Sequence, residues 1–334
     1  MRMIITFSWL LFCFLSAAQE KKVRMVFISD LHFGLKKAHF RNSKDSVSSE
    51  DVNSAMAKAI SSLGKIDYLV ITGDIANREE MPIQSASVSW KQFLEVYEPL
   101  HIPMLITPGN HDVSNAIGYY KPMYPEKDKT GLVGIYNLMH PDLHIDTSGF
   151  VYSSNLFNFS REIAGIHFEF ISIWPDSANR AWMEADLKKV SSKTPVLIFA
   201  HDPPEGDTQH FKNPLARGIN AHDKFQNLLA ETYTSHYEKE WDDFLKKHKN
   251  IKAYFHGHNN YQQSYTYSGV DKTLHLHCFR VDSPMKGKYS NVDEGLLSFQ
   301  LITIDPDKRT MEVKECLWNK TGNKKWGNKK SLRF

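Results

Sequence analysis

The chain has 334 residues, of which 41% are hydrophobic and 24% charged, and its formal net charge at pH 7 is +3. This composition excludes a chain that is disordered over most of its length and allows a large buried core. The small net charge and the lack of a recognised reader motif argue against binding to nucleic acid. The length would permit two domains, but we expect a single sheet-based domain with inserted loops.

The first 18 residues have the layout of a secretory signal peptide. Arg2 precedes an apolar run from Ile4 to Leu15, and small residues follow at 16–18. Because the run is short for a membrane span, we expect cleavage after residue 18 and a secreted or periplasmic protein with no stable membrane span. Retention as an anchor is one alternative. Lipidation of Cys13 is another, although Phe12 stands where a small residue would be expected.

The remaining chain is predicted to form one domain over 19–320 and a basic tail over 321–334. The tail holds a lysine cluster, which solvation explains at least as well as a polyanion site does. The cluster comprises Lys324, Lys325, Lys329 and Lys330. Two cysteines remain after cleavage, Cys278 and Cys316, and they could form one disulfide in an oxidising compartment. The sequence does not show whether they lie close enough.

Short apolar runs alternate with helical patterns in the first part of the domain, which predicts strand–helix–strand units and a sheet covered by helices. The expected elements are strands at Val23–Ser29, Tyr68–Thr72 and Met104–Thr107 and helices at Asp51–Leu63 and Trp90–Leu100. From Val113 to Ser148 the pattern weakens into a segment that is longer than an ordinary connection. Loops of that length are typically functional or mobile.

The second part of the domain follows the same alternation. The expected elements are paired strands at Phe150–Phe159 and Ile166–Ile173, a helix at Ser177–Val190, a strand at Val196–Ala200, a helix at Trp241–Lys247 and a strand at Ile251–Phe255. Several more strands are expected through Leu317. The chain has no internal repeat.

Polar side chains of the kind that bind metal ions come directly after five of these strands. In open α/β sheets, ligands bind where the strands end. Carboxylate and amide oxygens together with imidazole suit zinc, manganese or iron. The clusters are Asp30-Leu31-His32, Gly73-Asp74, Gly109-Asn110-His111-Asp112, His201-Asp202-Pro203 and Gly257-His258-Asn259-Asn260.

Two look-alike clusters have similar residues in a different context. Asp142-Leu143-His144 follows His140-Pro141 rather than an apolar strand, and His275-Leu276-His277 lies within a strand rather than after one. With 16 histidines in the chain, such pairs are expected by chance. We interpret both clusters as surface or half-buried polar residues.

The ordered set Asp-x-His, Gly-Asp, Gly-Asn-His-Asp, His and Gly-His, each at a strand end, resembles the calcineurin-like metallophosphoesterase superfamily. That superfamily includes purple acid phosphatases and related phosphodiesterases. The resemblance spans Met25 to about Asn260, and the 109–112 block is its most specific part. It implies an α/β fold, a layered αββα sandwich of mixed sheets flanked by helices, with the metal site at the strand ends.

The resemblance also implies which residues bind two metal ions. They are Asp30 and His32 for the first metal, Asp74 as the bridge, and Asn110, His201 and His258 for the second. The family's last ligand is a histidine two residues after the Gly-His pair, a position that is Asn260 in this chain. His256 lies on the same side of an extended segment as His258 and is a candidate substitute. An alignment that pairs His256 with His258 therefore stays open.

The implied chemistry is metal-dependent hydrolysis of phosphate esters. Two divalent or trivalent ions of manganese, iron or zinc would clamp the phosphoryl oxygens and supply a metal-bound hydroxide near neutral pH. His111 directly follows a ligand and would stand near the leaving group as a proton donor, with Asp112 as its natural partner. The alternative for His111 is a surface histidine in a turn.

The main prediction is an active phosphomonoesterase or phosphodiesterase that acts on a small-molecule phosphate ester. The alternative is a catalytically weak or inactive member that acts as a binding module. Members that lost catalysis should lack several ligands, whereas this chain keeps all but one expected position. A serine hydrolase is disfavoured because the chain has no Gly-x-Ser-x-Gly elbow. The loops at Val113–Ser148 and Glu205–His222 are the candidates for substrate selection.

Overall fold

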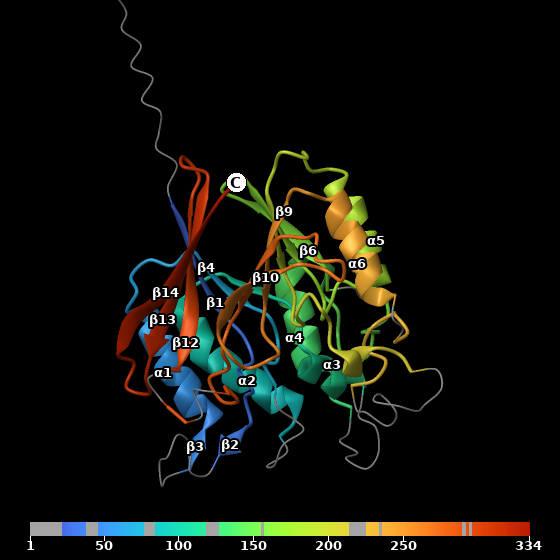
Figure 1. The fold of residues 1–334 in the computed structure, drawn as a ribbon. Coiled ribbons are helices and arrows are strands. Elements are labelled where there is room, and N and C mark those ends of the chain that lie inside the picture. The colour runs from blue at the N-terminus through green and yellow to red at the C-terminus, as the bar shows by residue number, and fades with distance from the viewer. Residues whose placement is uncertain are drawn as a thin grey trace, which may run out of the picture.

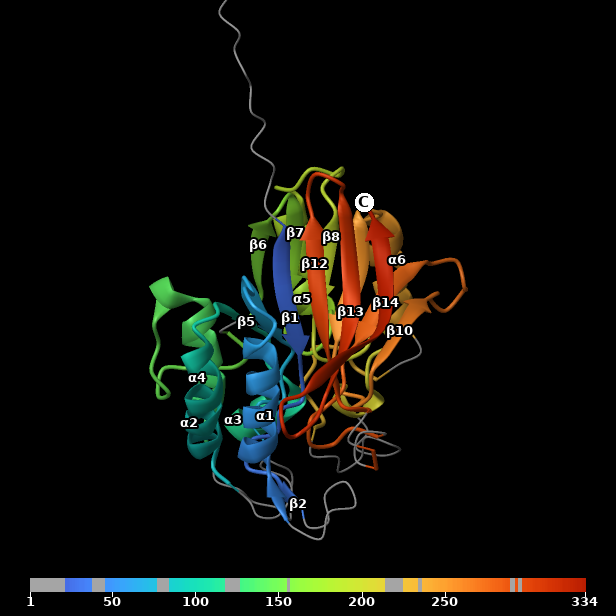
Figure 2. The same cartoon turned by 90° about the vertical axis from the view of Figure 1, so that its left-hand side faces the viewer.

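The computed structural model shows two six-stranded β-sheets that face each other, with helices on their outer sides (Figures 1 and 2). The described residues are 22–37, 46–76, 84–117, 127–154, 157–213, 225–233, 236–288, 292–293 and 296–334. This arrangement confirms the predicted α/β fold of mixed sheets flanked by helices. The predicted signal peptide lies outside the described residues.

The first sheet combines strands from both ends of the chain. Its order is β14-β13-β12-β1-β4-β5, in which β1, β4 and β5 run parallel and the other neighbours pair antiparallel. The strands are β1 (Val23–Ile28), β4 (Tyr68–Ile71), β5 (Met104–Ile106), β12 (Ser298–Asp305), β13 (Thr310–Trp318) and β14 (Lys324–Arg333). The parallel part brings the residues that follow β1, β4 and β5 to one edge of the sheet.

The second sheet has the order β10-β11-β9-β8-β7-β6, with a parallel centre and antiparallel pairs at both edges. The strands are β6 (Phe159–Ile163), β7 (Ile166–Phe170), β8 (Val196–Phe199), β9 (Ile251–His256), β10 (Gln263–Tyr267) and β11 (Leu276–Arg280). Helices α5 (Ser177–Leu187) and α6 (Tyr237–Lys247) lie along its outer side (Figure 1).

Helices α1 (Ser49–Ser61) and α2 (Ala86–Tyr97) lie beside β1, β4 and β5 (Figure 2). A capping box between Ser48 and Asp51 starts α1 by pairing backbone N–H groups that the helix leaves without partners. The smaller elements are β2 (Lys36–Lys37), β3 (Val47–Ser48), α3 (Asn110–Ile117), α4 (Thr130–Met139) and the 3-10 turns η2 (Glu98–Leu100), η3 (Pro141–Leu143) and η4 (Thr208–His210). Among the described residues, no helix has both the length and the apolar character needed to cross a membrane.

Phenylalanine rings join the two sheets at the centre of the core. Phe27 of β1 meets Phe199 of β8 and Phe255 of β9 edge-on, at ring-centroid distances of 5.9 and 5.5 Å. Phe199 and Phe255 stack on each other at 4.5 Å, and all three side chains are fully buried. Such aromatic contacts fix the relative positions of the strands. The packing therefore holds the ends of β1, β8 and β9 beside one another.

One predicted strand is wrong in its position. The segment Phe150–Phe159 was expected to be a strand, but β6 starts only at Phe159. The rings of Phe150 and Phe157 instead pack against Tyr136 of α4, at centroid distances of 5.8 and 5.7 Å. The apolar residues that suggest a strand thus form an aromatic cluster with Tyr136. The helix that carries Tyr136, α4, lies within the segment Val113–Ser148 that was predicted to be a loop.

The basic segment that the sequence analysis treats as a tail forms β14, an edge strand that pairs with β13. Its lysine side chains are solvent-exposed, as predicted, and Leu332 is its buried side chain. The backbone hydrogen bonds to β13 therefore stabilise the strand with little help from side-chain burial. Lysines on an edge strand also discourage pairing with other chains.

The two cysteines of the described chain lie on different sheets. Cys278 is on β11 and Cys316 is on β13, and both are buried as free thiols. The disulfide that the sequence left open is therefore not formed in this structure.

Candidate metal centre

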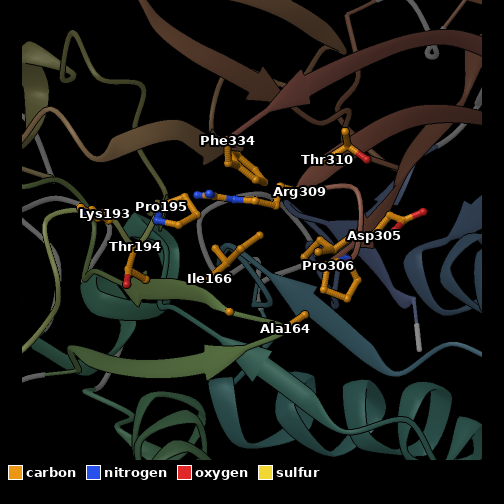
Figure 3. Close-up of a pocket in the computed structure, with 12 residues that line it drawn as sticks. Ala164, Ile166, Lys193, Thr194, Pro195, Asp305, Pro306, Arg309, Thr310 and Phe334 are labelled. Atoms are coloured by element: carbon orange, nitrogen blue, oxygen red, sulfur yellow. The ribbon is translucent and has the colours of Figure 1, made fainter. Parts of the chain in front are cut away.

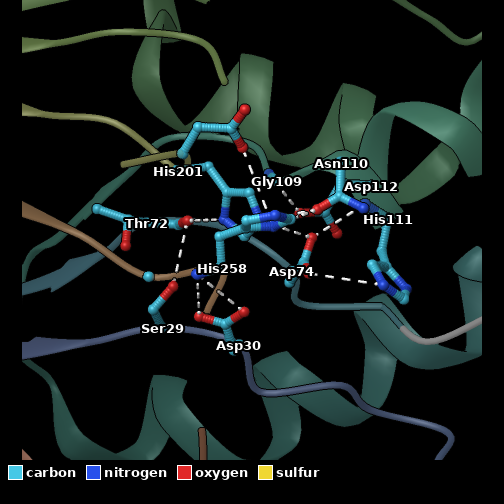
Figure 4. Close-up of polar contacts among 12 residues, drawn as sticks. Ser29, Asp30, Thr72, Asp74, Gly109, Asn110, His111, Asp112, His201 and His258 are labelled. Atoms are coloured by element: carbon cyan, nitrogen blue, oxygen red, sulfur yellow. Dashed lines mark hydrogen bonds and ion pairs between the residues drawn. The ribbon is translucent and has the colours of Figure 1, made fainter. Parts of the chain in front are cut away.

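The five strand-end clusters meet at one place between the two sheets (Figure 4). Each cluster follows a parallel strand, so all of them lie at the same edge of the fold. The side chains that gather there are Asp30 after β1, Asp74 after β4, Asn110 at the start of α3, His201 after β8 and His258 after β9. His32, also after β1, lies beside Asp30 and Asp74. The side chains that follow the five strands therefore lie together, as predicted from the motifs.

One half of the site is built around the amide oxygen of Asn110. His201 Nε2 lies 2.8 Å from Asn110 Oδ1, and His258 Nδ1 lies 3.2 Å from the same atom. Asp74 Oδ1 lies 3.4 Å from His201 Nε2. Donor atoms from four separate loops therefore surround one small space, in the combination predicted for the second metal.

The other half of the site contains His32 between two carboxylates. His32 Nε2 lies 3.8 Å from Asp74 Oδ2 and 3.9 Å from Asp30 Oδ1. The imidazole is fully buried, yet neither ring nitrogen has a hydrogen-bond partner among the described residues. An unsatisfied buried polar group costs about 1–3 kcal/mol. A metal ion at this position would satisfy the histidine, so the donor set fits a metal centre.

The ring nitrogens that face away from the centre are held by hydrogen bonds. His201 Nδ1 donates to the carbonyl oxygen of Thr72 at 2.6 Å, and His258 Nε2 donates to Asp207 Oδ2 at 2.7 Å. Metal-binding histidines usually have such an outer partner, which fixes the ring and its tautomer. Asp207 was missed by the sequence analysis because it is not at a strand end. It lies within the predicted loop Glu205–His222.

The charges of the centre depend on burial and on close neighbours. Burial lowers the pKa of His201, but the carboxylates of Asp74, Asp30 and Asp202 together outweigh burial and raise the pKa to about 10. Burial raises the pKa of Asp74, but His111 and His201 bring it well below the usual range. Burial, and then Lys286, hold the pKa of His32 well below its ordinary value. Asp74 is thus anionic and His32 neutral, which are the forms that bind metal, whereas His201 would release its proton when a metal ion binds.

Close packing explains the glycines of two motifs. A Cβ atom on Gly109 would lie 2.2 Å from Asp74 Oδ1, and one on Gly257 would lie 2.2 Å from Asp30 Oδ2. Both separations are far inside van der Waals contact, so only glycine lets these backbones approach the carboxylates. The backbone N–H of His258 donates to both oxygens of Asp30, at 3.1 and 2.9 Å.

Several site residues have left-handed backbone conformations that non-glycine residues rarely adopt. Their φ angles lie between 48° and 67°, and the residues are Asp30, His32, Asp74, His258 and Asn260. Such strain persists only where the surrounding structure enforces it, and it is concentrated at functional sites. The backbone here is therefore shaped to aim side chains rather than to minimise local strain.

His111 lies at the rim of the centre, beside the half of the site that contains His32. Its backbone N–H donates to Asp74 Oδ1 at 2.9 Å, and its ring Nε2 lies 3.7 Å from Asp74 Oδ2. The ring also packs edge-on against His32, with the centroids 4.8 Å apart. The predicted role of His111 at the leaving group stays a prediction.

Asp112 connects two of the converging loops through hydrogen bonds. Its carboxylate accepts the backbone N–H groups of Gly109, Ile75 and Ala76, at 2.9, 3.3 and 3.1 Å. Burial, and then the neighbouring Asp74, raise its pKa to about 6, although the backbone donors oppose this shift. Asp112 therefore joins the loop that carries Asp74 to the loop that carries Asn110. Its predicted role as the partner of His111 stays a prediction.

The structure separates the two candidates for the last ligand. The amide nitrogen of Asn260 donates to the carbonyl oxygen of His258 at 2.9 Å, while Asn260 Oδ1 is buried without a partner among the described residues. His256 Nε2 lies 2.9 Å from the Tyr265 hydroxyl, and its Nδ1 donates to the Gly257 carbonyl oxygen at 3.0 Å. Both nitrogens of His256 are thus engaged, so Asn260 is the residue with a free donor atom.

Lys286 brings a positive charge to the site and was missed by the sequence analysis. Its Nζ lies 3.5 Å from His111 Nε2. The segment that carries it follows β11 and is anchored where the Ser283 hydroxyl donates to the carbonyl oxygen of Asp30 at 2.8 Å. No motif marks this lysine, because it comes more than twenty residues after the last cluster.

The look-alike clusters lie apart from the centre. Asp142 belongs to η3 and, like His144, is exposed, while His275 is exposed and His277 half-buried on β11. The interpretation as surface or half-buried residues is confirmed. The position directly after a strand, rather than the residue types, distinguishes the clusters of the metal centre from the look-alike clusters.

A pocket of about 290 Å³ lies at the opposite end of the sandwich (Figure 3). Its lining includes Ile166 and Pro195, at the starts of β7 and β8, and Arg309. Because the metal centre lies past the other ends of these parallel strands, this pocket does not belong to it.

Comparison with known proteins places the fold. The profile described as calcineurin-like phosphoesterase matches residues 23–261. A dimetal phosphatase from Danio rerio has a similar structure, with a TM-score of 0.56 at 10% identity over 93% of this chain and 98% of that one. A 5'-nucleotidase precursor from Thermus thermophilus has a TM-score of 0.40 at 10% identity, over 94% of this chain and 54% of that one. A search of curated proteins finds no match.

The profile covers most of the chain and every strand-end cluster. The resemblance inferred from the motifs is therefore confirmed, and with it the class of reaction. The chain belongs to the calcineurin-like phosphoesterase family and is a hydrolase of phosphoric ester bonds.

Proposed function

We propose that this chain hydrolyses small-molecule phosphate esters at a centre of two metal ions, as a phosphomonoesterase or a phosphodiesterase. The observation that carries the proposal is the convergence of the strand-end donors around a buried histidine. Neither nitrogen of His32 has a hydrogen-bond partner among the described residues, and carboxylate oxygens of Asp74 and Asp30 lie 3.8 and 3.9 Å from its Nε2. Manganese, iron and zinc are the ions that suit this donor set.

The proposed ligands divide as the sequence predicts. Asp30 and His32 would hold one ion, Asp74 would bridge, and Asn110, His201 and His258 would hold the other. When bound, the two ions supply positive charge for the phosphoryl oxygens and make water a better nucleophile near neutral pH. The amide oxygen of Asn260, which is buried without a hydrogen-bond partner among the described residues, would complete the first set.

Residues at the rim would handle the substrate. Lys286 Nζ and His111 Nε2, 3.5 Å apart, offer a pair of donors for an anionic oxygen. We assign Lys286 to binding the phosphoryl group and His111 to stabilising or protonating the leaving oxygen. His111 Nε2 lies 3.7 Å from Asp74 Oδ2, the oxygen that also faces His32.

We also propose that the protein acts outside the cytoplasm. Support comes from the signal-peptide layout of the first 18 residues, with Arg2, the apolar run and the small residues before the predicted cleavage point. The test is to follow the size and location of the expressed protein, with a chain that lacks residues 2–18 as control. Retention of the full-length chain in the cytoplasm would contradict export.

Hydrolysis is tested on chromogenic mono- and diesters, with metal content measured on the same samples. Asp74→Ala and Asn110→Ala should each lower turnover by about 1000-fold or more, since several kcal/mol of transition-state stabilisation is lost. Asp142→Ala and His144→Ala are matched controls from the exposed look-alike cluster and should keep full activity. Circular dichroism should show all four variants folded.

The outcomes separate the two functional hypotheses. If the wild-type chain binds at least two metal ions per molecule but hydrolyses neither ester with any of the three metals, the proposal fails and the binding-module alternative stands. If Asp74→Ala or Asn110→Ala keeps near wild-type rates, the site assignment is wrong. The ratio of the two ester activities decides between monoesterase and diesterase.

A further inference from the structure

A second group of metal-ligand side chains lies outside the metal centre, between β7 and α5. His167 and Glu169 are two residues apart on β7, so their side chains project from the same face of the sheet. Asp186 belongs to α5, which lies along that outer face (Figure 1). One ligand atom of each of the three residues lies within 4.8 Å of the others.

Glu169 is the unusual member of this group. The side chain is fully buried, and neither carboxylate oxygen has a hydrogen-bond partner among the described residues. Burial, and then the nearby Asp186, raise the pKa of Glu169 well above its ordinary value. A buried carboxyl group is normally paired, hydrogen-bonded or bound to a metal ion. Among the described residues, Glu169 has neither an ion-pair partner nor a hydrogen-bond partner.

His167 is oriented as a ligand would be. Its Nε2 lies 2.9 Å from Asp186 Oδ2, on the side of the group, and its Nδ1 lies 2.5 Å from Glu162 Oε1. A carboxylate on the far nitrogen is the usual outer partner of a metal-binding histidine, since it fixes the tautomer and makes the ring more basic. Glu162 is on β6 and is largely exposed, so it does not belong to the buried group.

We propose that His167 Nε2, Glu169 and Asp186 bind one divalent transition-metal ion, with Zn²⁺ as the best match. One imidazole and two carboxylates are common zinc donors, and three protein ligands leave a fourth position for water. Donors about 2.0 Å from a tetrahedral ion stand roughly 3.3 Å apart, close to the 2.9 Å between His167 and Asp186. The side chain of Asp186 is 13% exposed, which gives the ion a route from solvent.

The bound ion would connect the helix layer to the sheet. His167 and Glu169 belong to a strand and Asp186 to the helix that covers it, so one ion would bridge the two layers. An ion that binds the folded chain but not the unfolded chain raises the melting temperature as the metal concentration rises. The proposed ion is therefore structural and separate from hydrolysis.

The test begins with a chain whose metal centre is disabled by Asp74→Ala and Asn110→Ala. Dialysed against Zn²⁺, this chain should retain one ion per molecule by elemental analysis. Adding Glu169→Gln, which keeps the shape of the side chain, should remove that ion. Adding Glu95→Gln, an exposed glutamate of α2, should leave it in place. Co²⁺ should give the visible absorption of a four-coordinate ion only where Glu169 is intact.

Further variants keep the proposal testable if one of them folds poorly. Asp186→Asn should also remove the ion, while Glu162→Gln should weaken Zn²⁺ binding by about 10- to 100-fold without abolishing it. In the otherwise wild-type chain, Glu169→Gln should lower the zinc content by one ion and leave hydrolysis unchanged. That result also separates this site from the proposed function.

Two results would overturn the proposal. One is a disabled chain that retains no Zn²⁺ and whose melting temperature does not rise with added Zn²⁺. The other is equal zinc content and equal Co²⁺ absorption with and without Glu169→Gln. Either result would mean that Glu169 is a buried, protonated carboxyl group and not a ligand.

Discussion

The imidazole of His258 is held between Asp207 and Asn110. Its Nε2 lies 2.7 Å from Asp207 Oδ2, and its Nδ1 lies 3.2 Å from Asn110 Oδ1. Burial raises the pKa of Asp207, but the hydrogen bond from His258 and the charges of His210 and His258 together hold the pKa well below its usual range. Asp207 is therefore anionic, and it aims the other ring nitrogen of His258 at the metal centre.

Asp207→Asn should weaken metal binding by about 10- to 100-fold, because asparagine cannot supply the negative charge that orients and polarises His258. Asparagine can still accept the backbone N–H of Gln209, which Asp207 does at 2.9 Å, so the local turn should survive. Chelator competition measures the affinity. Asp146→Asn is the control, since Asp146 holds an exposed turn in the same way. Equal affinities for the two variants would contradict this role.

Lys286→Met should lower kcat/KM for phosphate esters by about 10- to 100-fold, the usual effect of losing a hydrogen bond to a charged group. Metal content should not change, because the lysine is not a ligand. Lys288→Met is the matched control, since that side chain is exposed on the same segment. The assignment fails if the two variants have the same kcat/KM, or if Lys286→Met loses metal as well as activity.

Asn260→His should slow the loss of metal during dialysis, because imidazole is a stronger ligand than an amide oxygen at a position with a free donor atom. His256→Ala should leave metal retention near the wild-type level, since His256 contacts Tyr265 and the Gly257 carbonyl instead. Elemental analysis after timed dialysis measures both. Metal loss in His256→Ala, together with no change in Asn260→His, would favour the alignment that pairs His256 with His258.

The gathering of the strand-end residues could be predicted from sequence because parallel strands carry their following residues to one edge. Once the strands were located, the motifs that follow them could be placed at the same edge. The predicted strands agree with β1, β4, β5, β8 and β9. Asp207 and Lys286 could not be found in this way. Each reaches the centre through a loop whose path depends on tertiary packing, so nothing local in the sequence marks either residue.

The secondary-structure errors have a similar cause. Residues 150–158 have the apolar content of a strand, but their aromatic rings serve a cluster under α4. Lys324–Arg333 has the polar content of a tail, but the open edge of β13 supplies backbone hydrogen bonds that side-chain patterns do not reveal. In both segments a partner distant in the sequence decides the structure, so local propensity is overridden.

Glu169 predicts a pH dependence of stability in metal-free protein. Its pKa in the folded chain is well above the value of 4.5 for the free group, so the folded state keeps a proton that the unfolded state has lost. The unfolded state then binds fewer protons, and the free energy of unfolding should fall as pH rises above 4.5. The slope approaches about 1.4 kcal/mol per pH unit below the folded-state pKa.

Glu169→Gln should remove this part of the slope, because glutamine does not titrate. Urea unfolding at pH 5, 6 and 7 with a chelator present should show the wild-type chain losing more stability than the variant over this interval. Groups remote from Glu169 titrate equally in both chains, so the difference between the two curves reports Glu169 and its interaction with Asp186. With Zn²⁺ in place of the chelator, the wild-type chain should be more stable than the variant at pH 7, since Zn²⁺ binding requires the carboxylate that the variant lacks. Parallel curves with chelator would mean that Glu169 ionises in the folded chain as it does in the unfolded one.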